Sequence, residues 1–169
     1  MVEGHATRPG LEVRFEVVDP RRTEAVAAME AYFAELDERF PNGFDAGDAA
    51  TADAEHFEAP SGAFVLAFAD GTVAGCGAVQ TIADEVGEIK RMWIAPDQRG
   101  RGIARQLLER LEAVVADLGH TTIRLDTNAV LTDAIRMYER AGYRRIDRYN
   151  DNAYAELFFE KPAPAQPGR

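Results

Sequence analysis

The segment RMWIAPDQRGRGIARQLLERLE, residues 91–112, passes from an apolar strand pattern into an amphipathic helix pattern through a turn with two glycines and three arginines. A helix N-terminus leaves about four backbone N–H groups unpaired and carries partial positive charge. Glycines let an anion approach those groups, and arginines add donors. The segment therefore predicts an anion site suited to a pyrophosphate at a strand-to-helix turn. The alternative is a tight turn with solvated arginines.

Two common phosphate-binding loops do not match this turn. A Walker A loop requires Gly-Lys-Ser/Thr at the helix start, which this chain lacks. The dinucleotide fingerprint requires a third small residue where Arg105 stands. It also usually follows the first strand of a parallel sheet.

The order of periodic segments around the turn predicts a mixed α/β sheet. Alternating or apolar runs predict strands at 11–19, three within 63–96, and one each at 121–128, near 143–150 and near 153–161. Helical spacing predicts helices at 20–40, from the glycine turn to Gly119, and at 131–142. Residues 41–62 read as a mostly acidic loop that has room for a short helix.

Two features set the expected strand directions. The Asp70-Gly71 pair is a strong two-residue hairpin signal, and 83–87 supplies a second turn, so residues 63–96 should form an antiparallel meander. The strand-helix-strand unit at 88–127 should pair in parallel through a right-handed crossover. Helices are expected on both faces of the sheet.

The length of 169 residues predicts a single domain, expected at 11–161, with a flexible N-terminus at 1–10 and a disordered, Pro-rich tail at 162–169. The net charge of −10 argues against nucleic acid as the main partner. It is compatible with an amine substrate or with solubility alone. The single cysteine, Cys76, cannot form an internal disulfide, which favours a cytoplasmic protein. It lies in an apolar run and should be buried and inert. We expect neither a membrane span nor a metal site.

Two motifs resemble the signatures of the GNAT superfamily of N-acetyltransferases. The acyl-CoA signature is Arg/Gln-x-x-Gly-x-Gly/Ala after a strand ending in Val/Ile-x-Pro, and Arg99, Gly102 and Ala104 match it. The segment AIRMYERAGYRRI resembles the second signature, a helix carrying Ala, Tyr and Glu before Gly-Tyr/Phe. The resemblance covers about residues 11–161. It implies a mostly antiparallel sheet whose one parallel pair splays apart at the CoA site, and acetyl-CoA as co-substrate.

The resemblance also implies roles for individual residues. Tyr138 corresponds to the acid that protonates the leaving thiolate, and Glu88 to the base that deprotonates the amine, unless water takes that role. Trp93 either belongs to the core or lines the acyl pocket. Many family members have Asn where this chain has Leu131, and Asn128 can supply a related hydrogen bond. The cofactor-binding residues implied are Met92, Trp93, Ile94, Arg99, Gly100, Arg101, Gly102, Ile103, Ala104, Asn128 and Ala134.

The acceptor side is expected to combine acids that attract an ammonium group with arginines that grip a carboxylate. The candidates are Tyr32, Arg39, Phe40, Arg91 and Asp126, together with the acids of 45–58 and the segment 148–154. The sequence therefore predicts an acetyl-CoA-dependent N-acetyltransferase, a monomer or homodimer, acting on a small-molecule amine or amino acid. The alternatives are a protein lysine or N-terminal acetyltransferase, a non-catalytic acyl-CoA sensor and an interaction module.

Overall fold

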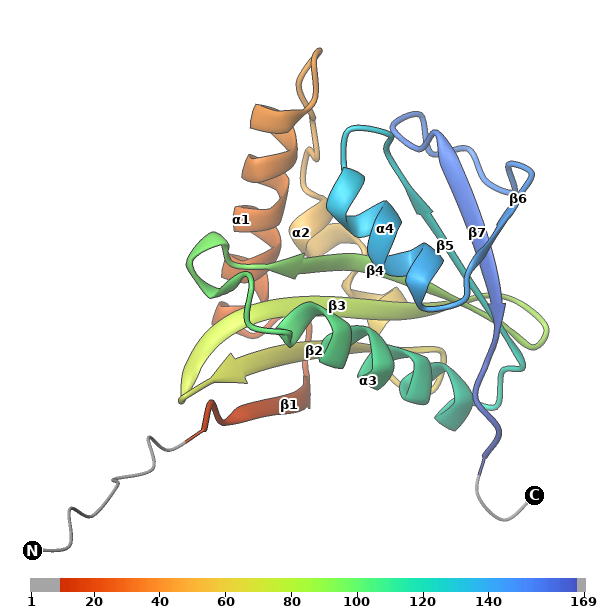
Figure 1. Cartoon of the computed structure of the whole chain (residues 1–169), viewed down its shortest axis with the longest axis horizontal. Helices are drawn as coiled ribbons and strands as arrows, with labels where there is room; N and C mark the ends of the chain where they lie inside the picture. The colour runs from red at the N-terminus through yellow and green to blue at the C-terminus, as the bar shows by residue number, and fades with distance from the viewer. Residues whose placement is uncertain (1–9, 167–169) are drawn as a thin grey trace, which may run out of the picture.

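The computed structural model describes residues 10–166 and forms one seven-stranded sheet with helices on both faces (Figure 1). The elements are β1 (Val13–Val18), α1 (Thr23–Arg39), α2 (Ala49–Ala52), the 3-10 helix η1 (Ala54–Phe57), β2 (Gly62–Ala69), β3 (Thr72–Ala83), β4 (Val86–Ile94), the 3-10 helix η2 (Pro96–Gln98), α3 (Ile103–Asp117), β5 (Thr122–Thr127), α4 (Thr132–Arg140), β6 (Arg144–Ile146) and β7 (Leu157–Pro162). Among residues 10–166 no helix has both the length and the apolar character that a membrane span requires.

Both chain ends extend past the described residues. Residues 1–9 of the expected flexible N-terminus and 167–169 of the expected tail lie outside them. The first two residues of that expected tail pair with the sheet, because β7 runs through Pro162 and the Ala163 N–H donates to the Thr121 carbonyl. Pairing of the sheet thus continues two residues past the expected boundary at 161.

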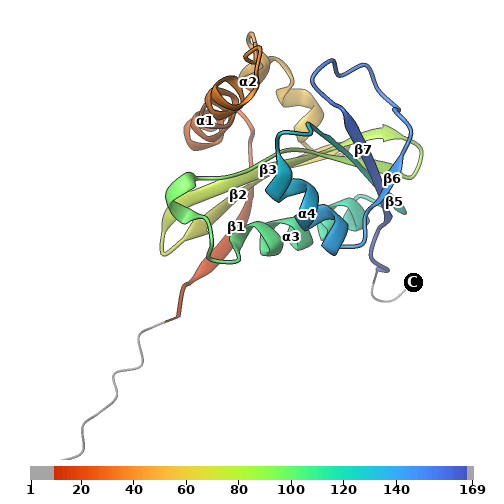
Figure 2. The same cartoon turned by 45° about the horizontal axis from the view of Figure 1, so that its top comes forward.

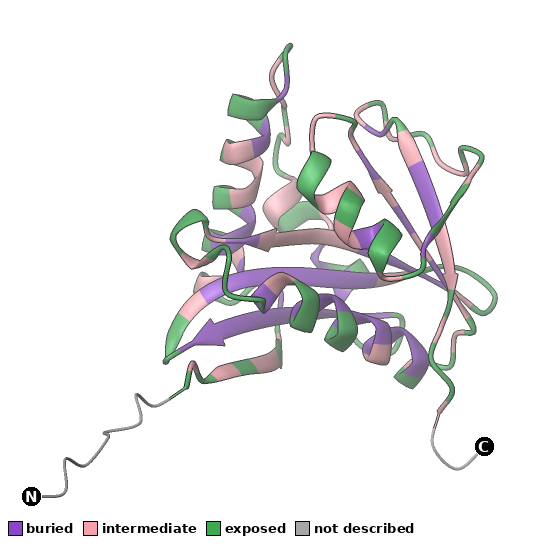
Figure 3. Ribbon diagram, in the orientation of Figure 1, coloured by how far each residue is buried: buried purple, intermediate pink, exposed green. Residues whose placement is uncertain are grey.

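Strands β2 to β4 form the antiparallel meander predicted for residues 63–96, and β1 pairs antiparallel with β2 at its edge. Asp70 and Gly71 both have positive φ, at 50° and 82°, which is the conformation of a hairpin turn that follows the right-handed twist of its strands. Strand β2 is buried along its whole length (Figure 3). The central strands therefore form a rigid floor beneath the elements that follow.

The parallel pair predicted around 88–127 is present, and it is short. Strand β4 pairs with β5 only from Val86 to Glu88, opposite Thr122–Arg124. Beyond that point β4 stays with β3, whereas β5 stays paired with β7 as far as Thr127. Figure 1 shows the two strands diverging. This splay, expected from the resemblance, leaves one backbone edge of β4 without a strand partner.

Two cores lie on opposite faces of the sheet (Figure 2). On one face α3 contributes Leu107, Leu108 and Leu111, which pack with buried residues of the central strands. On the other face α1 contributes Met29 and η1 contributes Phe57. The helical spacing seen in the sequence therefore corresponds to real buried stripes.

The predicted strands near 143–150 and 153–161 are too long. Strand β6 has three residues, and β7 begins only at Leu157. Between them Asn150 accepts the N–H of Asn152 at 3.1 Å, and Asn152 accepts the N–H of Tyr154 at 3.1 Å. Such turns compete with strand pairing, so 147–156 folds as a loop.

Candidate active site

A cavity of about 780 Å³ lies where β4 and β5 separate. Its wall is formed by β4, the ends of β5, the N-terminal turn of α3, α4, α1 and the segment of α2 and η1. This volume is in the range of small-molecule sites. The cavity brings together residues from the glycine turn, both predicted signatures and the predicted acceptor side.

The glycine turn begins α3 and faces the cavity. Gly100 and Gly102 both have φ of 78°, a left-handed conformation that favours glycine. A Cβ at either position would meet nothing within 4 Å, so space is open in front of the backbone. The N–H groups of residues 103–105 find no acceptor within residues 10–166. These unpaired donors and the open space before the glycines fit a pyrophosphate, as expected for coenzyme A.

The arginines of this turn differ in position. Arg99 lines the cavity, donates from Nε to the Ile94 carbonyl at 3.0 Å and is paired with Glu35 of α1. Arg101 does not line the cavity, and it donates to the Gln98 side chain at 2.7 Å. Of the cofactor residues expected in the turn, Arg99, Gly100, Gly102, Ile103 and Ala104 therefore line the cavity, and Arg101 lies beside it.

Strand β4 forms the floor of the cavity through Met92, Trp93 and Ile94. The pairing with β3 is interrupted between Cys76 and Ala78, and opposite that irregularity Arg91 has φ of 57°. A bulge of this kind bends a strand and re-aims its side chains. Because β5 has already turned away, the outer edge of this part of β4 can pair with an extended ligand amide.

Tyr138 of α4 lines the cavity, and its side chain is otherwise packed in the core. The residue is only 7% exposed, yet its hydroxyl has no hydrogen bond to residues 10–166 and is not sealed from solvent. Burial raises the pKa of Tyr138 to about 12, and the charge of Asp126 adds to the rise. The hydroxyl is therefore protonated at neutral pH and open to the cavity. Ala134, one turn earlier on the helix, lines the same cavity.

Asn128 lines the cavity, but its amide holds the protein's own backbone. Its Nδ2 donates to the Tyr154 carbonyl at 2.8 Å, and its Oδ1 accepts the Val130 N–H at 3.0 Å. The expected hydrogen bond from Asn128 to coenzyme A would have to compete with both contacts. In this arrangement Asn128 positions the loop 147–156.

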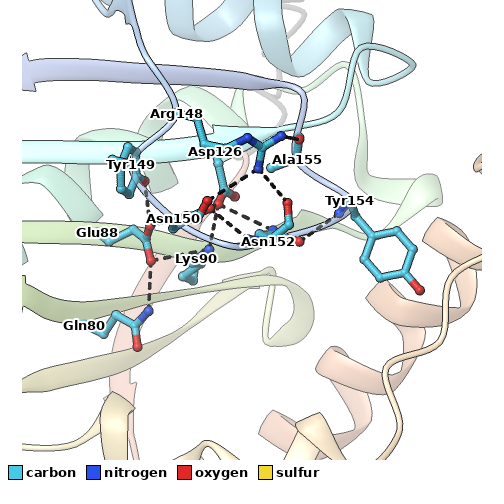
Figure 4. A network of polar contacts seen from close by, with 10 residues as sticks. All are labelled: Gln80, Glu88, Lys90, Asp126, Arg148, Tyr149, Asn150, Asn152, Tyr154 and Ala155. Atoms are coloured by element: carbon cyan, nitrogen blue, oxygen red, sulfur yellow. Dashed lines mark hydrogen bonds and ion pairs between the residues drawn. The ribbon is translucent and has the colours of Figure 1, made fainter.

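Glu88, the expected base, is enclosed by donors (Figure 4). Its oxygens accept from Gln80 at 2.8 Å, Tyr149 at 2.5 Å and Asn150 at 3.3 Å, and Lys90 lies at 3.4 Å. The side chain is 2% exposed, and it does not line the main cavity but a smaller hollow beside it. These contacts describe an anchor for the loop 147–156 and give no support to a base that faces the amine.

Asp126 of β5 continues this network toward the cavity. Its Oδ2 accepts from Lys90 at 3.0 Å, Asn150 at 2.6 Å and Asn152 at 3.4 Å. The sequence analysis identified Asp126 and, within the segment 148–154, the two asparagines, but it gave Lys90 no role. The alternation of Glu88 and Lys90 along one strand was the available signal, since residues two apart share a face.

The expected acceptor residues Tyr32, Arg39 and Phe40 line the cavity. They are joined by Phe44, which the sequence analysis did not name, and by Tyr154 of the expected segment 148–154. Their rings lie 4.5 Å apart between centroids, and Phe40 lies 5.8 Å from Phe44. Phe44 lies in a stretch without a clear period, so no pattern in the sequence marked it.

Arg91 does not present a free guanidinium to the cavity. It donates to the Ala49 carbonyl at 2.8 Å and to Asp53 at 2.7 Å, and its guanidinium lies 5.0 Å from the ring centres of Phe33 and Phe57. Burial lowers its pKa, and the charge of Asp53 opposes this. The expectation that Arg91 grips a substrate carboxylate is therefore not supported, because Arg91 secures the acidic segment instead.

Cys76 is buried as expected. Its Sγ donates to the Arg91 carbonyl at 3.3 Å, and burial raises the pKa of its thiol to about 12. A thiol in this state is a poor nucleophile. Within residues 10–166 no cluster of three or more His, Cys, Asp or Glu side chains is arranged to hold a metal ion.

The family model described as the acetyltransferase (GNAT) family matches residues 29–143. The chain is 36% identical over 104 residues to an IAA acetyltransferase of Azospirillum brasilense, a match that covers 59% of this chain and 67% of that protein. Two further curated relatives are matched over 56% and 55% of their own length. This chain therefore spans little more than half of those proteins.

Solved structures show the same fold. A candidate acyl-CoA N-acyltransferase from Klebsiella pneumoniae superposes with a TM-score of 0.72 at 26% identity, over 89% of this chain and 97% of that one. A candidate acetyltransferase from Salmonella typhimurium, solved with its cofactor acetyl-CoA, superposes with a TM-score of 0.69 at 14% identity, over 94% and 98%. At the lower identity the likeness shows the fold alone.

Proposed function

The chain belongs to the GNAT acetyltransferase family, and from that premise we propose that it transfers the acetyl group of acetyl-CoA directly to a primary amine of a small molecule or amino acid. Membership makes it an acetyl-CoA-dependent acetyltransferase. One observation carries the finer proposal. A single cavity joins the donor-rich turn of α3, the unpaired edge of β4 and an unpartnered tyrosine hydroxyl.

Acetyl-CoA would be held by backbone groups more than by side chains. The free N–H groups at the start of α3 would bind the pyrophosphate, and Met92 and Ile94 would offer backbone groups to the pantetheine arm. When bound, acetyl-CoA supplies an activated acetyl group as a thioester with a thiol as leaving group. Leu131 and Ala134, both lining the cavity, would pack against the cofactor.

Tyr138 would act as the acid. The amine nitrogen forms a bond to the acetyl carbon, the bond from that carbon to sulfur breaks, and the Tyr138 hydroxyl gives its proton to the departing sulfur. The phenol is available as a proton donor because it is protonated at neutral pH and its hydroxyl has no hydrogen-bond partner within residues 10–166. The proton that the amine loses passes to water, and water in turn gives a proton to the Tyr138 phenolate.

We propose that water accepts the proton of the amine. Glu88 then has a structural role, as an anchor for the loop 147–156. The network around Glu88 leaves it no open face on the main cavity. Glu88→Gln is therefore expected to lower the free energy of unfolding by about 1–3 kcal/mol, and with it the melting temperature. The shape of the pH–rate profile should stay unchanged. Thermal unfolding and a pH–rate profile on the same variant measure the two effects.

The opposite result would support the original expectation that Glu88 is the base. If Glu88→Gln lowered kcat/KM by roughly 10²-fold with recovery at high pH, where the free amine is abundant, Glu88 would be a general base. Glu160→Gln is the comparison variant, because Glu160 is also paired with cationic side chains, those of Arg124 and Arg144, but does not line the cavity.

The shape of the acceptor side favours a small acceptor over a protein. Ala49, Asp53, His56 and Phe57, all from the α2–η1 segment, line the cavity and cover that side. A protein lysine would need an open groove. A sensor that only binds acyl-CoA would have no use for the open hydroxyl of Tyr138.

The direct test is a thiol-release screen with acetyl-CoA over a panel of amines, amino acids and lysine peptides. We expect release above background with at least one small primary amine and none with the peptides. Release only with peptides would favour the protein acetyltransferase. No release with any acceptor, in a protein that binds acetyl-CoA, would favour the sensor.

A further inference from the structure

Beyond the cofactor site, the acceptor end of the cavity has two unlike parts, an acidic group and a wall of aromatic rings. We infer that the acceptor is a primary amine on an aromatic body without a carboxylate, its ammonium group held by Asp126 and its body by Phe33, Phe40, Phe44 and Tyr154. This inference rests on the proposed function and narrows its substrate class.

Asp126 has one oxygen committed to the protein and one that is open. Its Oδ2 accepts all three of its hydrogen bonds, from Lys90, Asn150 and Asn152. Its Oδ1 accepts none from residues 10–166, and it is not among the polar atoms sealed from solvent. The side chain is 8% exposed and lines the main cavity but not the smaller hollow. A nearly buried carboxylate with an open oxygen is a partner for an ammonium donor.

The aromatic wall begins beside that carboxylate. Asn152 donates to Asp126, and its own Oδ1 holds the N–H of Tyr154, so the loop fixes the tyrosine next to the acid. Figure 4 shows the Tyr154 ring pointing away from the network. Tyr154 packs on Phe44, which stacks on Phe33 with centroids 5.6 Å apart. These half-buried rings line the cavity and suit a flat apolar group.

The cations that line the cavity are already paired. Arg91 is held by Asp53 and Ala49, and Lys90 lies between Glu88 and Asp126. Glu35 pairs with both Arg99 and Arg39, at 3.6 Å for the latter. An acceptor carboxylate would therefore enter a site where, within the described chain, each lining arginine or lysine already has an acidic partner. Burying a carboxylate without its own partner is costly.

The wild-type protein can test this with matched acceptors, compared at one concentration of free amine. We expect kcat/KM for phenethylamine to exceed that for phenylalanine by about 10²-fold, because only the carboxylate differs. It should exceed that for n-butylamine by roughly 10-fold or more, because the ring is lost. Phenylalaninamide, which keeps the bulk without the charge, should stay within about 10-fold of phenethylamine.

Two substitutions locate the effect. Asp126→Asn should raise KM for phenethylamine by roughly 10- to 100-fold and leave KM for acetyl-CoA unchanged. Asp84→Asn, the same change at an exposed position that lines neither the main cavity nor the smaller hollow, should alter neither. Phe44→Leu keeps apolar volume but removes the ring, so it should reduce the preference for phenethylamine over n-butylamine.

The outcomes separate this inference from the proposed function. Phenylalanine acetylated as well as phenethylamine, or no preference over n-butylamine, would overturn the inference while thiol release confirmed an acetyltransferase. Unchanged KM for phenethylamine in a folded Asp126→Asn protein would remove Asp126 from recognition. Absence of thiol release with every amine would instead refute the proposed function.

Discussion

Replacing Gly102 with glutamate is expected to abolish the binding of acetyl-CoA, which calorimetry should detect in the wild type with micromolar-range affinity, about −8 kcal/mol. The Cβ of residue 102 would project into open space at the start of α3. A glutamate there would place bulk and negative charge where the pyrophosphate needs free N–H groups. The left-handed φ of 78° adds some strain, so stability must be measured alongside binding.

Gly119→Glu is the matched control for that experiment. Gly119 follows the other end of the same helix, has φ of 90° and also has nothing within 4 Å of a built Cβ. It does not line the cavity. Both variants should lose similar stability, and only Gly102→Glu should lose binding. Undiminished binding in Gly102→Glu would show that the turn is not the phosphate site.

Replacing Tyr138 with phenylalanine is expected to lower kcat by roughly 10²-fold, the lower range for a positioned acid. The ring and its packing remain, and the hydroxyl has no partner to lose within residues 10–166, so the fold should survive with little change in melting temperature. Acetyl-CoA affinity should change little, because the expected phosphate and pantetheine contacts come from other elements. Steady-state kinetics, calorimetry and thermal unfolding together measure the three expectations.

Tyr143→Phe provides the comparison for Tyr138. Tyr143 is also buried, but its hydroxyl donates to Glu112 at 2.8 Å and it does not line the cavity. Its loss should lower stability by about 1–3 kcal/mol and leave kcat unchanged. A large fall in acetyl-CoA affinity with unchanged kcat in Tyr138→Phe would make Tyr138 a binding residue. No effect on either would leave it a core residue.

The fold was largely predictable because its signals are local. The stripe of α3, the Asp70-Gly71 turn and the glycine turn are each encoded within a few neighbouring residues. Strand ends were less predictable at 147–156, where asparagine side chains hold the backbone in turns. The periodicity of apolar residues does not reveal that side chains compete with strand pairing for the backbone N–H groups.

The site was predictable only in part, because several roles depend on contacts between distant segments. Glu88 accepts a hydrogen bond from Tyr149 across 61 positions of sequence, and that contact favours a role as an anchor over the expected role as a base. Arg91 sits at a bulge and lines the cavity, but its guanidinium is paired with Asp53 and is not free for a substrate. The alternation of residues along β4 in the sequence predicts neither the bulge at Arg91 nor the pairing of Arg91 with Asp53. The turn at 99–104 was predictable because backbone geometry and glycine spacing define it.

Direct acetyl transfer is tested most directly by following acetyl-CoA labelled in its acetyl group, with and without an accepting amine. We predict that each thiol released is matched by one labelled N-acetyl product, and that the protein carries no label when the amine is omitted. The buried thiol of Cys76, with its pKa of about 12, gives no route to a labelled cysteine. Thiol release without an acetylated amine, or label retained on the protein, would contradict the account.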